Sequence, residues 1–174
     1  MRRPTPSPPP VPEQDELRRV PIARPVDTAF AAAEAFFALP EEVKARYPWR
    51  RELNAGWESR AQVRPSTRVA DQKESHQVTR PHRDGLWPSE EEVPGFRSRM
   101  LAIEAAAWRV AMDVLSCFAD RLGFDRDFFE RANDPQREGY QSTVRLLHHF
   151  PMTGEEFEGG GWRAQQRINA DFTR

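Results

Sequence analysis

The side chains of this 174-residue chain that are best suited to bind a metal or move a proton are its four histidines: His76, His82, His148 and His149. His148 and His149 are neighbours on a predicted strand, so their side chains point to opposite faces and cannot share one ion. His76 and His82 lie in weakly patterned segments and have no histidine or acid partner at helical spacing. The single cysteine, Cys117, has no nearby histidine–acid pair that would activate a thiol. These residues alone do not define a complete catalytic site, and no CxxC, HExxH, GxGxxG or P-loop pattern is present.

Composition narrows the class of protein. Hydrophobic residues make up 38% of the chain and charged residues 30%, a low apolar content for a self-sufficient globular domain. The net charge is −1 and no basic stripe occurs, which argues against a nucleic-acid partner. No apolar run is long enough to span a bilayer, and the Met1-Arg2-Arg3 start lacks the apolar core of a signal peptide. We therefore expect a soluble cytoplasmic protein with no membrane partner.

The stretch that must position any site is a long predicted helix, Pro94–Gly123. Proline suits the first turn of a helix and glycine suits its C-terminal end. Apolar residues recur along it in two files that together cover more than half of the helix circumference: Phe96, Met100, Ile103, Ala107, Val110, Val114 and Cys117, with Leu101, Trp108, Ala111, Leu115, Phe118 and Leu122. Such a helix must pack against a large surface, and we expect Cys117 to be a small buried hydrophobe. Any apolar part left uncovered favours self-association.

The other elements follow from local pattern. Residues 1–24 are predicted to form a disordered, proline-rich tail. Helices are expected over 25–39, 40–44 and 125–131, and a turn at Asn54–Trp57. Strands are expected over 71–78, with one wet face, over 142–150, and over 162–173. This order, mostly helices first and strands later, predicts an α+β fold with its sheet at the C-terminal end.

Six segments, taken in order, resemble one family. They are FFALPEEVKARYP (36–48), NAGW (54–57), DQKESHQV (71–78), LWPSEEEVPGFRSRM (86–100), LGFDRDFF (122–129) and YQSTVRLLHHFP (140–151). Their order is similar to that in the N-terminal region of non-haem Fe(II)/2-oxoglutarate-dependent dioxygenases, the isopenicillin N synthase-like oxygenases in particular. The resemblance extends over residues 26–172.

The resemblance implies a helical N-terminal region, residues 25–139, packed on an incomplete double-stranded β-helix (jelly roll) that begins at residues 140–174. It also implies Fe(II) and 2-oxoglutarate as cofactors and a small molecule as substrate. The family holds iron with a His-X-Asp pair and a later histidine. Asp171 matches the carboxylate here, but Asn169 stands in the place of the histidine. His148 and Phe150 match pocket-lining positions on the family's first core strand, which makes them the candidate co-substrate contacts.

Three hypotheses follow. The first is a fragment of such an oxygenase that is inactive as this chain, because the distal histidine would lie beyond Arg174. The second is a non-catalytic helical module that binds a partner through an exposed apolar helix face. The third is a truncated gene model of an active dioxygenase, with the absent ligands encoded downstream.

Overall fold

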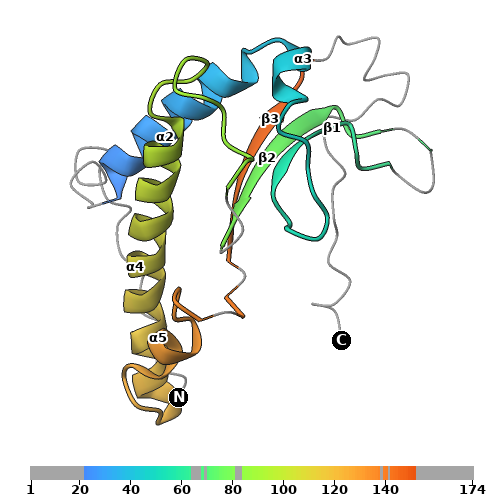
Figure 1. Ribbon diagram of the computed structural model, residues 1–174. Coiled ribbons are helices and arrows are strands. Elements are labelled where there is room, and N and C mark those ends of the chain that lie inside the picture. Colours follow the sequence, from blue (N-terminus) through green and yellow to red (C-terminus); the bar gives the residue numbers. More distant parts are fainter. Residues whose placement is uncertain are drawn as a thin grey trace, which may run out of the picture.

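The computed structural model of the protein describes residues 22–63, 68, 70–80, 84–137, 139–140 and 142–151. These residues form four helices and three strands (Figure 1): α2 (Ala23–Phe37), α3 (Glu41–Lys44), β1 (Gly56–Ser59), β2 (Lys73–Thr79), α4 (Phe96–Leu122), α5 (Phe128–Ala132) and β3 (Thr143–His149). None of the helices in these ranges is long and apolar enough to cross a membrane. The predicted strand at 162–173 and residues 1–21 of the predicted tail lie outside the described residues.

The three strands form one open antiparallel sheet in the order β1-β2-β3. The register places Trp57 opposite His76 and His76 opposite Leu146, so these three side chains share one face. The outer edge of β1 is covered by the segment before it, since Trp57 exchanges backbone hydrogen bonds with Tyr47 and Trp49 at 2.7 Å each. Helices and an open sheet confirm the predicted mixture of α and β structure.

Gly56 makes this covered edge possible. Its φ is +108°, and a Cβ at this position would lie only 2.4 Å from the carbonyl oxygen of Pro48. Glycine alone permits both the backbone conformation and the close approach. The sequence predicted only a turn at Asn54–Trp57. In the structure the backbone at Gly56 packs closely against that of Pro48, and β1 begins within the predicted turn.

Helix α2 and the first turns of α4 cover one face of the sheet. The alanine-rich sequence of α2 favours helix, and Pro40 ends the run shortly after Phe37. Its inner face joins the sheet and α4 in one apolar core: Ala29, Ala32, Ala33, Phe36, Phe37, Trp57, Val93, Phe96 and Met100, with Leu146 packed against them. The core thus consists of helix side chains on one side and alternate strand side chains on the other.

Helix α4 lies between two glycines of positive φ, Gly95 and Gly123. Figure 1 shows that it runs past the sheet, and among the described elements α5 is the one that lies beside its second half. Val110, Val114 and Phe118 are exposed there, at a spacing of four residues. The prediction that Cys117 is buried is wrong, because this stretch of the helix has no sheet beneath it and the thiol is exposed.

Two further expectations are corrected. Strand β2 was expected to have one wet face, yet Glu74 to Thr79 are all buried, because side chains of both neighbouring strands, such as Glu58 and Arg145, pack over the face turned away from the helices. The sheet was expected at the C-terminal end, yet β1 and β2 precede α4 in the chain. The strand predicted over 71–78 is thus part of the sheet, whereas β1 is a short strand with a weak period-two signal and was not predicted.

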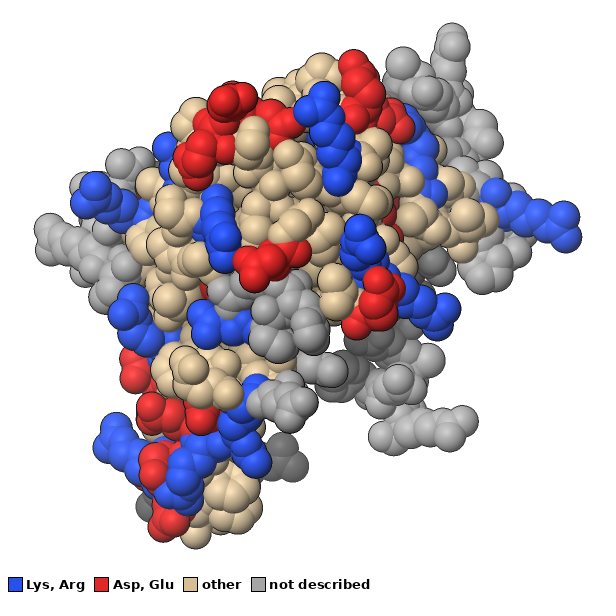
Figure 2. All heavy atoms as spheres, in the orientation of Figure 1, with Lys and Arg blue, Asp and Glu red and all other residues tan. Residues whose placement is uncertain are grey.

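The surface carries no gathered charge of one sign on the face shown in Figure 2. Uncharged side chains occupy much of that face, and acidic and basic groups are interspersed. At the α5 end, the Arg131 guanidinium pairs with the carboxylates of Asp125 and Asp127.

Candidate functional site

The candidate co-substrate contact His148 lies on the helix-covered face of β3. Its Nδ1 is 2.9 Å from Glu74 Oε1, and its ring stacks on Phe37 with centroids 5.3 Å apart. A carboxylate only accepts hydrogen bonds, so Nδ1 of His148 carries the hydrogen. These two contacts fix the ring between the sheet and α2.

The second candidate, Phe150, lies directly after β3. Its backbone N–H donates to the carbonyl of Gln72 at 3.0 Å, which continues the β2–β3 pairing by one residue. The ring centroid of Phe150 is 5.6 Å from that of His148. The Arg60 guanidinium lies over the Phe150 ring, 4.3 Å from its centroid. The structure therefore brings the two candidates together, as their i, i+2 spacing on a strand predicts.

Glu74 is the centre of a buried polar network beneath these residues. Its Oε2 accepts hydrogen bonds from Lys44 Nζ at 2.8 Å and from Trp57 Nε1 at 2.7 Å. Lys44 Nζ also donates to the carbonyl of Phe37 at 3.0 Å, near the end of α2. Glu74 and Lys44 are both buried. One carboxylate thus joins α2, α3 and all three strands, and it positions His148.

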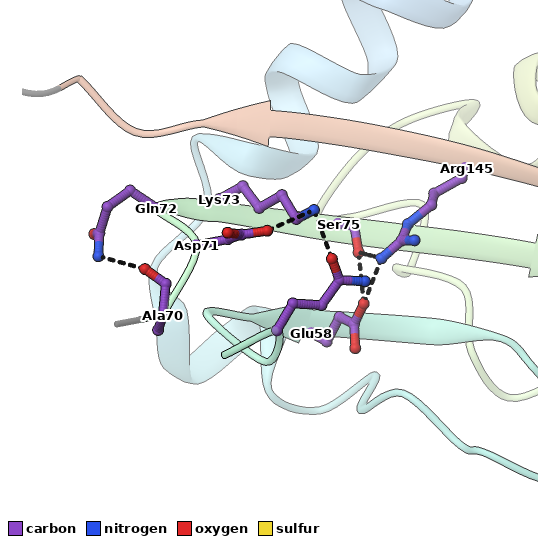
Figure 3. Close-up of polar contacts among 8 residues, drawn as sticks. Glu58, Ala70, Asp71, Gln72, Lys73, Ser75 and Arg145 are labelled. Atoms are coloured by element: carbon purple, nitrogen blue, oxygen red, sulfur yellow. Dashed lines mark hydrogen bonds and ion pairs between the residues drawn. The ribbon is translucent and has the colours of Figure 1, made fainter. Parts of the chain in front are cut away.

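The opposite face of the sheet carries a second polar cluster, shown in Figure 3. Arg145 Nη2 lies 2.6 Å from Glu58 Oε1 and 3.1 Å from Ser75 Oγ. Ser75 Oγ in turn donates to Glu58 Oε1 at 3.1 Å. The three residues come one from each strand, and about a third of the Arg145 side chain is exposed. The cluster presents a guanidinium with fixed orientation and further N–H donors, the geometry that suits carboxylate or carbonyl oxygens.

A second ion pair begins β2, beside this cluster. Lys73 Nζ lies 3.2 Å from Asp71 Oδ2 and donates to Gln62 Oε1 at 2.9 Å. Figure 3 places it next to the Glu58–Ser75–Arg145 cluster, along the same strand. The face turned away from the helices is therefore lined with paired polar side chains, whereas the helix-covered face is mainly apolar.

His76 has a structural place. Its ring packs against those of Phe36 and Phe96 in the core, and its Nε2 lies 3.0 Å from the carbonyl oxygen of Leu86. Since a carbonyl only accepts, Nε2 carries the hydrogen and Nδ1 is bare. Burial lowers the pKa of His76 to about 4, because a charged imidazole would lose its hydration there. His76 is therefore neutral at physiological pH and supports the core.

An iron centre is not formed by the described part of the chain. Within it, no three His, Cys, Asp or Glu side chains are arranged so that they could hold a metal ion. The predicted ligand Asp171 and its neighbour Asn169 lie outside the described residues, and an amide is a poor substitute for the imidazole. The described residues therefore do not fit the metal.

Sequence reasoning missed Glu58, Glu74 and Arg145. The period of two places Ser75 and Arg145 on definite faces of their strands. It does not say which residues of separate strands are opposite, and β1 itself was not predicted. Without the strand register, the sequence could not predict either the network around Glu74 or the Glu58–Ser75–Arg145 cluster.

Neither a protein-family model nor a curated protein matches this chain. Several solved structures do. A full-length protein from Neurospora crassa, crystallised with alpha-KG and thymine, is 26% identical with a TM-score of 0.68 over 84% of this chain and 49% of its own. A 2OG-Fe(II) oxygenase family protein from Caulobacter crescentus is 26% identical with a TM-score of 0.62, over 76% of this chain and 46% of its own.

A third structure, JOX2 in complex with 2OG, Fe and JA, is 21% identical with a TM-score of 0.57, over 71% of this chain and 36% of its own. At that identity it supports the fold alone. The chain spans about half the length of the Neurospora protein, so the arrangement of α2, α4 and the sheet is shared with one part of that longer protein.

Proposed function

We propose that this chain is the N-terminal part of an oxygenase of the 2OG-Fe(II) family that oxidises a small molecule. Fe(II) and 2-oxoglutarate are the cofactors of that family, and the Neurospora protein and JOX2 were crystallised with 2-oxoglutarate. The observation that carries the proposal is the match of 84% of this chain to the Neurospora protein at 26% identity. When bound, the two cofactors would activate O₂, which is the oxidant, and this chain would supply a scaffold.

The architecture of the proposed oxygenase follows from the two faces of the sheet. Residues 25–139, which include β1 and β2, would form the bracing region, and residues 140–174 would begin the jelly-roll core, after a tail at 1–24. The helix-covered face is filled by the apolar core. We propose that a small polar molecule approaches from the other face, where Arg145 has the required donors.

Arg145 is the residue of this chain that we propose contacts a carboxylate or carbonyl oxygen of the co-substrate or substrate. Glu58 and Ser75 hold one of its nitrogens, so little side-chain freedom is lost on binding. The assignment of His148 and Phe150 to co-substrate binding stays a prediction. Both residues lie on the helix-covered side of the sheet, opposite Arg145, where their contacts with Glu74, Phe37 and Arg60 hold them.

We propose further that the 174-residue chain does not turn over 2-oxoglutarate by itself. Only Asp171 matches a position of the family's iron triad, and one carboxylate beside an amide binds Fe(II) weakly. The cytoplasmic location also stays a prediction.

The experiment has two parts. The purified chain is incubated with Fe(II), 2-oxoglutarate and oxygen, and succinate is measured; we expect none, and stoichiometric iron binding with succinate production contradicts the proposed inactivity. The nucleotide sequence past the Arg174 codon is then read. A histidine–X–aspartate with a distal histidine there supports a truncated gene model of an active enzyme, and their absence from all frames contradicts that model.

If an extended product is active, Arg145→Met tests the pocket. We expect its KM for 2-oxoglutarate or for the substrate to rise, since a lost charge-assisted hydrogen bond costs about 1.5–3 kcal/mol. Arg109→Met is the matched control, because Arg109 is exposed on α4 away from the sheet. Equal KM values for Arg145→Met and Arg109→Met would show that Arg145 does not contact the co-substrate or the substrate.

A second function is favoured by one observation, the exposed row of Val110, Val114 and Phe118 on α4. Such a row is typical of a helix that binds another helix, as in a non-catalytic interaction module that self-associates. Phe118→Glu should then abolish the association in sedimentation experiments. A monomeric wild-type chain would exclude this function for α4.

A further inference from the structure

One polar side chain of β2 is buried without a partner. The strand's period of two puts Lys73, Ser75, Gln77 and Thr79 on the face turned away from the helices. Gln77 is only 7% exposed, yet none of the described residues forms a hydrogen bond with its side-chain amide. The side chains of the other three are all hydrogen-bonded. Buried amides without a partner are rare in folded proteins, so this position indicates a place where a further molecule supplies the partner.

The polar groups on both sides of Gln77 already bind one another. Toward the end of β2, Thr79 Oγ1 donates to the carbonyl oxygen of Asn54 at 2.6 Å and lies 2.8 Å from Thr143 Oγ1. Asn54 Nδ2 donates to Thr143 Oγ1 at 3.0 Å. Toward the start of β2 lies the cluster of Figure 3, in which serine, glutamate and arginine side chains are bonded together. The Gln77 amide lies between these two clusters and belongs to neither.

The strand register gives Gln77 one neighbour that a ligand could share. On β1 it is opposite Gly56, which has no side chain to reach the amide, and on β3 it is opposite Arg145. Phe150 N–H bonds to the carbonyl of Gln72, and such hydrogen-bonded pairs recur at every second residue. Gln77 and Arg145 therefore form a non-hydrogen-bonded pair, in which side chains are closest. The Arg145 side chain is 32% exposed, so a small molecule can reach the pair from solvent.

Arg145 and Gln77 offer different hydrogen-bonding groups. Nη2 of Arg145 is held by Glu58 and Ser75, but its Nη1 and Nε have no hydrogen-bond partner among the described residues. A guanidinium only donates, whereas the Gln77 amide has both N–H donors and a carbonyl acceptor. Rotating the amide by half a turn exchanges the places of its oxygen and nitrogen and keeps both functions. The two residues together thus present several donors and one acceptor.

This combination distinguishes between ligand groups. A carboxylate has only acceptors, so it would satisfy Arg145 and leave the carbonyl oxygen of Gln77 buried without a donor, which lowers affinity. A cyclic imide, –CO–NH–CO–, is planar and has one N–H between two carbonyl oxygens. Its N–H can donate to the Gln77 carbonyl, while its oxygens accept from the Gln77 N–H and from Arg145. The imide therefore leaves no group of the pair without a partner.

We propose that Gln77 and Arg145 form a substrate subsite, and that the substrate presents a planar imide edge to it. Gln77 bonds to the N–H and to one adjacent carbonyl, and Arg145 donates to the second carbonyl. Gln77 is then the residue that selects an imide over a carboxylate. The inference rests on the proposed function, because it names the substrate class for the face that Arg145 lines.

An NMR titration of the isotope-labelled 174-residue chain tests the proposal with three probes: succinimide, N-methylsuccinimide and succinate. Succinimide should shift the side-chain N–H signals of Gln77 and Arg145 until the site is saturated. N-methylsuccinimide has the same carbonyls but no N–H, so it should bind at least tenfold more weakly, the effect of about 1.4 kcal/mol. Succinate should shift the Arg145 signal and leave the Gln77 signals in place.

Two variants accompany the titration. Gln77→Met keeps an unbranched side chain and removes both polar groups of the amide, so it identifies the Gln77 signals and should weaken succinimide binding at least as much as N-methylation of the probe does. Gln136→Met is the matched control at an exposed glutamine after α5, and it should bind succinimide like the wild type. The comparison of the two imides uses the wild-type chain, so it decides the question even if Gln77→Met does not fold.

Equal binding of succinimide and N-methylsuccinimide overturns the proposal, and so does a wild-type chain whose Gln77 and Arg145 signals are not shifted by succinimide. Tighter binding of succinate also overturns it and assigns the subsite to a carboxylate. The titration needs neither iron nor oxygen, so its outcome is separate from that of the oxygenase assay. Succinimide binding together with the absence of iron ligands past the Arg174 codon would keep the subsite and reject the oxygenase.

Discussion

Replacing Glu74 with glutamine should destabilise the fold strongly, because the change leaves a buried ammonium without its counter-ion. Lys44 Nζ lies 2.8 Å from Glu74 Oε2, and the two side chains are 8% and 1% exposed. In the variant, the remaining hydrogen-bond acceptor of Lys44 Nζ is the backbone carbonyl of Phe37. The new amide keeps an acceptor for Trp57 but cannot neutralise Lys44.

Removing one partner of a buried ion pair costs about 3–5 kcal/mol, and the retained hydrogen bond places the expected loss near the lower value. A domain has only about 5–15 kcal/mol of stability in total, so the loss is large. Urea unfolding followed by tryptophan fluorescence measures it as a lower midpoint with an unchanged slope. Glu42→Gln, an exposed acid of α3, is the control and should change stability by less than about 0.5 kcal/mol.

A double-mutant cycle separates the pair from its surroundings. Lys44→Met alone should also destabilise, since it leaves the buried carboxylate with only Trp57 and His148. The double variant Lys44→Met/Glu74→Gln should cost less than the sum of the two by about 1 kcal/mol or more, because no unpaired charge remains. Additive effects, or a loss in Glu74→Gln as small as in Glu42→Gln, would refute the assignment of Glu74 as the centre of the network.

Two other predictions concern stability. The pKa of His76 is lowered from 6.5 to about 4, so between these pH values the unfolded chain binds a proton that the folded chain does not. The stability of the fold is therefore fully present above pH 6.5, and about 3 kcal/mol of it is lost on acidification to pH 4. His76→Gln should flatten that part of a pH series of urea midpoints, and an unchanged pH slope would contradict the burial argument. Gly56→Ala should cost more than about 1 kcal/mol, since its Cβ would lie 2.4 Å from Pro48 O; a midpoint equal to the wild type would show that the backbone can relax there.

Local patterns predicted the four helices of the described residues and two of their three strands. Alanines and flanking prolines located α2, and the period of the apolar residues located α4 between its glycines, because both signals act within a few residues of the chain. The strand at 142–150 was predicted in the same way, and β3 is found at Thr143–His149. The ordered motifs also predicted the oxygenase resemblance, which the solved structures support.

What the sequence by itself determined is therefore the set of local elements and the resemblance to the oxygenase family. Only the tertiary structure decided which side chains meet. Lys44 and His148 are 30 and 74 residues away from Glu74 in the chain, and their contact with it depends on the register of β2 with β3 and on where α3 lies. The same holds for Arg145 and Glu58, which are 87 residues apart. Polar side chains give no period to read, and their pairing is fixed by the strand register that the buried apolar faces select.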